Sequence, residues 1–177
     1  MKKKVIGLIP TRLSSTRLPK KPLIRINGIP LIIHTYRRAK LSKKLDELVI
    51  CCDDKKIMNI AKKYKAKAIL TSKKHKNGTE RIYEAYKKMK KKYDLIVDIQ
   101  GDEPLISPNQ IDDVIDFHFK NSKTDITTGF TTTGVPITIN TDRVDAELCE
   151  NDNKQARLSL RRKPTPYRVP YNHYRKT

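Results

Sequence analysis

Several features that would place this 177-residue chain in a familiar class are missing from its sequence. No apolar run reaches the length needed to cross a membrane, and Pro10 and Arg12 interrupt the lysine-rich start before a signal peptide could form. The three cysteines include no C-x-x-C pair, which argues against a zinc site and a disulfide framework. We therefore expect a cytoplasmic protein in a reducing setting, with one real core and no membrane association.

The usual signatures of nucleotide and nucleic-acid binding are missing as well. Neither G-x-x-x-x-G-K-[ST] nor G-x-G-x-x-G occurs in the chain. The net charge of +20 is large, but the lysines fall on expected helix surfaces without interleaved aromatic residues or a known DNA- or RNA-binding motif. A solvated lysine-rich surface is the favoured reading, with no specific nucleic-acid partner, and a basic nucleic-acid-associated protein is kept as an alternative.

The chain does contain a basic, hydroxyl-rich segment directly after its first apolar run, residues 5–9. Residues 9–23 read Ile-Pro-Thr-Arg-Leu-Ser-Ser-Thr-Arg-Leu-Pro-Lys-Lys-Pro-Leu. Its cations cannot be buried without partners, but together with neutral amide and hydroxyl donors they can surround a polyanion. This segment therefore outlines a nucleotide-phosphate site, and the alternative is an ordinary basic surface loop.

Apolar strands alternate with amphipathic helices along the first two thirds of the chain. Strands are expected at residues 5–9, 48–52, 68–70 and 95–99, and helices at residues 30–38, 56–64, 79–91 and 107–119. This alternation predicts an α/β fold with an open, mostly parallel sheet and helices on both faces. The pattern degrades after about Asp125, so we expect a nucleotide-binding domain at residues 1–125 and a partial or degenerate region at residues 126–177.

Polar residues follow three of these strands, at the edge where parallel sheets bind ligands. The basic segment follows the first strand, Asp53 and Asp54 follow the second, and Asp102 and Glu103 follow the fourth. Two carboxylates beside a tight glycine turn suit Mg²⁺, which takes one or two carboxylates, waters and phosphate oxygens. Asp102 is the expected metal ligand and Glu103 a neighbouring group; an ordinary turn with a helix-capping acid is the alternative.

A further polar loop, residues 75–81, precedes the third expected helix. Thr79 is expected to cap that helix, with Glu80 favouring its positive end. His75 is expected to be a loop residue, although a general base is an alternative. No Ser-His-Asp or Cys-His set can be defended from the spacing.

Four pieces of the chain together resemble the 3-deoxy-manno-octulosonate cytidylyltransferases, or CMP-Kdo synthetases. These pieces are residues 9–23, Asn-Gly-Ile-Pro at 27–30, His-Lys-Asn-Gly-Thr-Glu-Arg at 75–81 and Gln-Gly-Asp-Glu-Pro at 100–104. The resemblance covers about residues 4–120 and implies a Rossmann-like nucleotidyltransferase. It also implies the transfer of CMP from CTP to an eight-carbon 3-deoxy acid sugar, with release of pyrophosphate, for lipopolysaccharide biosynthesis, and a homodimer.

The resemblance also assigns roles to individual residues. Those assigned to the nucleotide are Arg12, Ser15, Arg17, Lys21, Asp53, Asn77, Gly78, Thr79 and Gln100. Lys21 or Arg17 would offset the charge on the departing pyrophosphate. Asp102 would hold Mg²⁺, the expected cofactor, which polarises the phosphate and orients the nucleophile.

The likeness weakens toward the end of the chain. Residues 161–167 look like an eroded form of the family's Ser-Arg-x-x-Ile-Pro-Tyr segment, and the parts expected after it include a second metal-binding aspartate and much of the dimer contact. We therefore expect either a truncated or frameshifted copy, or a fragment of a longer protein. A catalytically impaired nucleotide-binding remnant is the corresponding alternative to an active enzyme.

Overall fold

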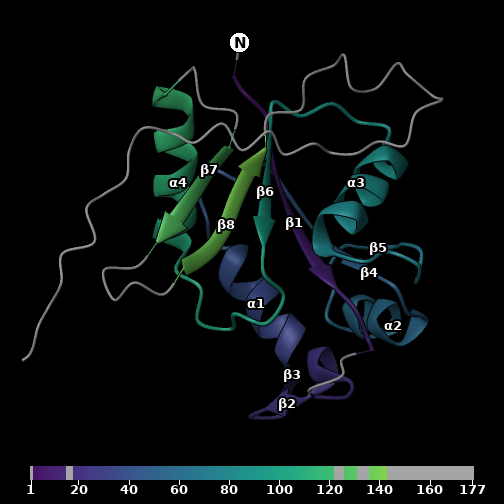
Figure 1. Cartoon of the computed structure of the whole chain (residues 1–177). Helices are drawn as coiled ribbons and strands as arrows, with labels where there is room; N and C mark the ends of the chain where they lie inside the picture. Colours follow the sequence, from purple (N-terminus) through teal and green to yellow (C-terminus); the bar gives the residue numbers. More distant parts are fainter. Residues whose placement is uncertain (1, 15–17, 122–125, 131–135, 143–177) are drawn as a thin grey trace, which may run out of the picture. The chain divides into compact units, whose positions relative to one another are not determined.

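The computed structural model describes residues 2–14, 18–121, 126–130 and 136–142, all within the first of two units, residues 1–144, into which the chain divides. Its main feature is a six-stranded sheet in the order β5-β4-β1-β6-β8-β7 (Figure 1). The strands are β1 Val5–Thr11, β2 Arg25–Ile26, β3 Ile29–Pro30, β4 Glu47–Cys52, β5 Ala68–Leu70, β6 Leu95–Ile99, β7 Ile126–Phe130 and β8 Pro136–Asp142. The helices are η1 Lys21–Leu23, α1 Leu31–Ala39, α2 Lys55–Lys63, α3 Gly78–Met89 and α4 Pro108–Lys120.

The part of the sheet formed by β5, β4, β1 and β6 is parallel, and helices cover it on both faces. The predicted α/β fold is therefore confirmed, with element ends within a few residues of those expected. None of the described helices is long and apolar enough to cross a membrane.

Two strands lie in the region that we expected to be degenerate. Strand β8 pairs antiparallel with β6, and β7 pairs antiparallel with β8, so the sheet continues past residue 125. Figure 1 shows both strands beside α4, which contacts them. Both are rich in threonine, whose branched side chain suits an extended backbone, so a strand signal was present. The functional division at residue 125 stays a prediction.

Strand β1 lies inside the parallel part of the sheet and is buried on both faces. Val5 and Ile9 belong to the apolar cluster formed with α1, α2 and α4, whereas Ile6 and Leu8 belong to the cluster formed with α3. Burial on both sides explains why this strand is a continuous apolar run instead of an alternating one.

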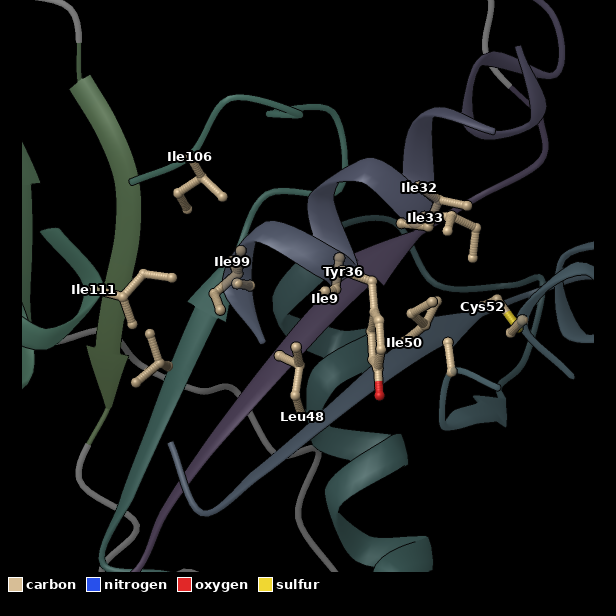
Figure 2. Close-up of a cluster of buried hydrophobic side chains, with 14 of the residues drawn as sticks. Ile9, Ile32, Ile33, Tyr36, Leu48, Ile50, Cys52, Ile99, Ile106 and Ile111 are labelled. Carbon is tan, nitrogen blue, oxygen red and sulfur yellow. The ribbon is translucent and has the colours of Figure 1, made fainter. Parts of the chain in front are cut away.

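Helix α1 supplies the centre of the larger apolar cluster. Figure 2 shows Ile32, Ile33 and Tyr36 of this helix pointing toward side chains of β1 and β4, among them Ile9 and Ile50. The Tyr36 hydroxyl accepts a hydrogen bond of 3.3 Å from the amide of Lys67, just before β5. The one polar atom of this core residue is thereby satisfied.

The starts of α2 and α3 are each capped by a side chain. Asp54 caps α2 by accepting from the amide of Lys56 at 2.8 Å, and this bond lowers the pKa of the Asp54 carboxyl. Asn77 caps α3 by accepting from the amide of Glu80 at 2.9 Å. The expectation that Thr79 caps this helix is therefore wrong, because the helix begins one residue before it.

Cys51 and Cys52 are free and lie on opposite faces of the sheet. Cys51 packs with the α3 cluster and Cys52 with the cluster of α1 and α2. Burial raises the pKa of both thiols, in Cys52 to about 11. Both side chains therefore act as small apolar groups at neutral pH.

Glu47, at the start of β4, ties three segments together. Its carboxylate accepts hydrogen bonds from the Tyr93 hydroxyl, from Lys67 Nζ at 2.9 Å and from Lys91 Nζ at 3.1 Å. The bond from Tyr93 and those from the two lysines outweigh burial and lower the pKa of Glu47 from 4.5 to about 2.

Replacing Glu47 with Gln should lower the free energy of unfolding at neutral pH by about 1–3 kcal/mol, because these three donors lose a charged acceptor. Since the pKa of Glu47 is lower in the folded chain, its contribution is complete above about pH 4.5 and is lost as the pH falls toward 2. Urea denaturation should show the gap between wild type and Glu47→Gln shrinking from about pH 5 to pH 3. A gap that stays constant over this range would contradict the assignment.

Candidate functional site

Three polar segments meet at one edge of the sheet because β1, β4 and β6 run parallel. In the register, Thr11 at the end of β1 pairs with Cys52 at the end of β4, and Leu8 pairs with Asp98 of β6. The basic loop (residues 12–20), Asp53 and the turn after Ile99 therefore leave the sheet side by side. This is the carboxyl edge, where α/β sheets bind ligands.

A cavity of about 340 Å³ opens at this edge, within the usual size range for small-molecule sites. Its lining residues come from the end of β1 and the residue after it, the loop before α3, the first turns of α3, and β6 with the residue after it: Pro10, Thr11, Arg12, His75, Lys76, Asn77, Gly78, Thr79, Arg81, Asp98 and Gln100. It brings together five residues that the sequence assigned to the nucleotide, namely Arg12, Asn77, Gly78, Thr79 and Gln100.

The start of α3 forms one wall of the cavity. The side chain of Glu80 accepts from the amide of Lys76 at 2.9 Å and from Asn77 Nδ2 at 3.1 Å, so the turn before the helix is fixed from both sides. Gly78 lies so close to β1 that a Cβ atom there would be 3.2 Å from Cγ of Pro10. The first-turn amides and positive end of α3 are thus held beside the cavity, an arrangement that favours an anion.

The acidic turn after β6 is held by a hydrogen bond from α1 and by close contact with the end of β1. The Thr35 hydroxyl of α1 donates to the carbonyl of Gly101 at 3.2 Å. A Cβ atom on Gly101 would be 3.1 Å from the carbonyl oxygen of Pro10, which is tighter than most contacts of this kind. A glycine here therefore lets the turn that carries Asp102 lie directly against the end of β1.

Lys21 and Asp102 form an ion pair across 81 positions of the sequence. Lys21 begins the short helix η1 after the basic loop, and Asp102 lies in the acidic turn. Their side chains are 38% and 47% exposed, so both charges are within reach of a ligand. The structure thus places Lys21, expected to offset phosphate charge, next to Asp102, expected to bind Mg²⁺.

A second cavity, of about 490 Å³, shares Arg12 with the first. It is lined by the basic loop, the end of β4 and a lysine after β5: Arg12, Leu13, Ser14, Pro19, Lys20, Asp53, Asp54 and Lys73. Asp53, assigned by the resemblance to the nucleotide, is 6% exposed, and its Oδ1 accepts from the amide of Leu13 at 2.9 Å. Ser15 and Arg17, predicted to bind phosphate, lie outside the described residues.

His75 is held by carboxylates beside the first cavity. Its Nε2 pairs with Glu84 Oε2, and its Nδ1 lies 3.7 Å from Glu80 Oε2. Burial alone would raise the pKa of Glu84, but bonds from Lys88, the amide of Ser72 and His75 outweigh it and lower that pKa to about 2. The Glu84 carboxylate therefore stays charged and fixes the orientation of the imidazole.

Two buried charged residues at the site were not assigned a role from the sequence. Asp98 is 7% exposed and Arg81 is 3% exposed, and both line the first cavity. A signal for Asp98 was present, since it is an acid inside an otherwise apolar strand. Arg81 belongs to the motif at residues 75–81, but its burial is evident only in the folded chain.

The comparisons with known proteins agree with this geometry. The cytidylyltransferase family matches residues 6–176. A 3-deoxy-manno-octulosonate cytidylyltransferase, mitochondrial, of Arabidopsis thaliana is 47% identical over 112 residues, which are 63% of this chain and 39% of that protein. The 3-deoxy-manno-octulosonate cytidylyltransferase of Parabacteroides distasonis is 45% identical over 125 residues, 71% of this chain and 49% of its own length. The chain thus spans half or less of these relatives.

Among solved structures, a CMP:2-keto-3-deoxy-manno-octonic acid synthetase complexed with CTP superposes with a TM-score of 0.71. It is 24% identical and the match covers 79% of this chain and 74% of that one, which demonstrates a shared fold. With the family match over nearly the whole sequence and the predicted motifs gathered at one edge of the sheet, the chain belongs to the cytidylyltransferase family and is related to the 3-deoxy-manno-octulosonate cytidylyltransferases.

Proposed function

We propose that the chain carries the CTP-binding half of an enzyme that transfers CMP from CTP to 3-deoxy-manno-octulosonate, or a close analogue, for lipopolysaccharide biosynthesis in the cytoplasm. One observation carries this proposal: Arg12, the start of α3 and Gln100 line one cavity next to the Lys21–Asp102 pair. It is supported by relatives named for this reaction and by a neighbour of the same fold that is complexed with CTP.

The proposed roles follow from charge and position. Arg12 and Lys21 are the described cations that would bind the triphosphate, with the positive end of α3 at Gly78 and Thr79 adding neutral amide donors. Gln100, with both a donor and an acceptor on its amide, is suited to the ribose or the sugar. A homodimer stays a prediction, as do the proposed phosphate contacts of Ser15 and Arg17.

Magnesium fits the residues at this site in one particular way. Among the described residues, no three His, Cys, Asp or Glu side chains gather into a metal cage. Asp102 offers one partly exposed carboxylate beside the expected phosphates, and Mg²⁺ is commonly bound by one or two carboxylates with phosphate oxygens and water. When bound, Mg²⁺ would neutralise phosphate charge and polarise the phosphorus–oxygen bonds.

The reaction needs positioning and charge neutralisation more than covalent help from the protein. The anomeric hydroxyl of the sugar acid attacks the α-phosphorus of CTP, and a new oxygen–phosphorus bond forms. The bond from the α-phosphorus to the bridging oxygen breaks, pyrophosphate leaves with the electron pair, and the hydroxyl proton passes to solvent. Lys21, or Arg17 as the resemblance also implies, would offset the charge that grows on the leaving pyrophosphate.

Calorimetry should show that CTP binds in preference to UTP and ATP, and that Mg²⁺ strengthens this binding. The proposal expects a preference for cytosine because the relatives named above are cytidylyltransferases. Equal binding of the three nucleotides, or none, would contradict a working CTP site. If CTP binds selectively, release of pyrophosphate in the presence of 3-deoxy-manno-octulosonate distinguishes an active enzyme from a nucleotide-binding remnant.

Asp102→Asn should remove most of the Mg²⁺ dependence of CTP binding, since the substitution removes the proposed metal ligand. Without Mg²⁺, the same variant should bind CTP as well as the wild type or up to about tenfold more tightly, because Lys21 is released and one negative charge is lost. Titrations of CTP with and without Mg²⁺ measure both effects.

Asp116→Asn provides a matched control. Asp116 pairs with Lys44 at 2.6 Å, and their side chains are exposed to 44% and 41%, close to the values of Asp102 and Lys21. This pair involves α4 and none of the residues that line the two cavities. Mg²⁺ dependence that survives in Asp102→Asn, or disappears equally in Asp116→Asn, would contradict the role of Asp102.

A further inference from the structure

Asp53 and Arg81 form a buried ion pair at the site. Asp53 directly follows β4, and Arg81 lies in the first turns of α3. Arg81 Nη2 is 3.7 Å from Asp53 Oδ2, and the two side chains are only 3% and 6% exposed. A buried charge is costly unless it is paired, so each of these residues requires the other.

Other bonds fix the orientation of the Arg81 guanidinium. Its Nη1 donates to the Thr71 hydroxyl at 2.7 Å and to the carbonyl of Ser72 at 3.1 Å. The Thr71 hydroxyl in turn donates to the carbonyl of Cys52 at 3.0 Å, at the end of β4. The guanidinium is therefore anchored to the loop after β5 and can present a fixed charge to Asp53.

The other carboxylate oxygen of Asp53 holds the backbone of the basic loop. Oδ1 accepts from the amide of Leu13 at 2.9 Å, one residue after Arg12. Arg12 lines both cavities, whereas Arg81 lines the first and Asp53 the second. The pair thus lies between the two cavities and supports the backbone from which Arg12 extends.

We propose that Asp53 and Arg81 are positioning residues, which fix the start of the basic loop for phosphate binding without contacting the base. This inference rests on the proposed function and deepens it. A bare carboxylate beside a triphosphate would repel it, but Arg81 neutralises Asp53 and leaves its oxygen as an acceptor for Leu13. Asp53, which the resemblance assigned to the nucleotide, can therefore lie near the proposed phosphate site without repelling the ligand.

The first test compares CTP with CMP, which has the same base and ribose but a single phosphate. In Asp53→Asn and in Arg81→Gln, affinity for CTP should fall about tenfold, whereas affinity for CMP should change by less than about threefold. Arg81→Lys, which keeps the charge but loses the forked donors, should recover part of the CTP affinity. The double variant should lose no more than the worse single one, since the two residues act as a pair.

The second test needs no nucleotide. Hydrogen exchange at residues 11–14 should accelerate in Asp53→Asn and Arg81→Gln, while the amides of β6 keep their protection. Asp112→Asn is the matched control, because Asp112 also accepts from loop amides, those of Lys43 and Lys44, at 3.1 Å each. It should alter exchange at its own loop and leave the ratio of CTP to CMP affinity unchanged.

Each outcome decides the inference. Equal losses for CTP and CMP would mean that Asp53 contacts the base or ribose, and would overturn it. Unchanged exchange at residues 11–14 in both variants would overturn it as well. If the wild-type chain does not bind CTP in preference to UTP and ATP, the proposed function fails. The exchange experiment still decides whether the Asp53–Arg81 pair holds the loop.

Discussion

The arrangement of the site depends on one constraint: β1 is buried on both faces between two parallel neighbours. A strand in that position cannot carry charge along its length, so polar side chains emerge only where it ends. Because β4 and β6 run in the same direction, their polar ends emerge at the same edge. Segments that are 81 positions apart in the sequence, those of Lys21 and Asp102, thereby become neighbours.

Much of this arrangement could be predicted from the sequence. The apolar run from Val5 to Ile9, the helical spacing of Ile57 and Ala61, and the glycine turn at Gly101 each depend on local physics, and the structure agrees with all three. A parallel sheet then requires that the segments after the strands meet. The grouping of Arg12 with the start of α3 agrees with that rule and with the roles that the resemblance implied.

What could not be predicted depends on partners that are distant in the sequence. Asp53 was expected near the nucleotide, but its bonds to Leu13 and Arg81 are set by tertiary distances that no local pattern encodes. Asn77 displaced Thr79 as the cap of α3 because the helix begins one residue earlier than the apolar spacing indicates. Strand β8 was missed although residues 137–140 alternate apolar and polar side chains, because its place in the sheet depends on antiparallel pairing with the distant strand β6.

The opposite orientation of Cys51 and Cys52 has a chemical consequence. Neighbouring residues in a strand point to opposite faces, so the two sulfur atoms are kept apart and a disulfide between Cys51 and Cys52 is prevented while β4 stays extended. Thiolates, not thiols, react with alkylating reagents, and burial keeps both groups protonated. Each layer of helices therefore shields one thiol, with α3 covering Cys51 and α1 and α2 covering Cys52. Alkylation of Cys51 would report that the α3 side of the sheet has opened, and alkylation of Cys52 would report that the opposite side has opened.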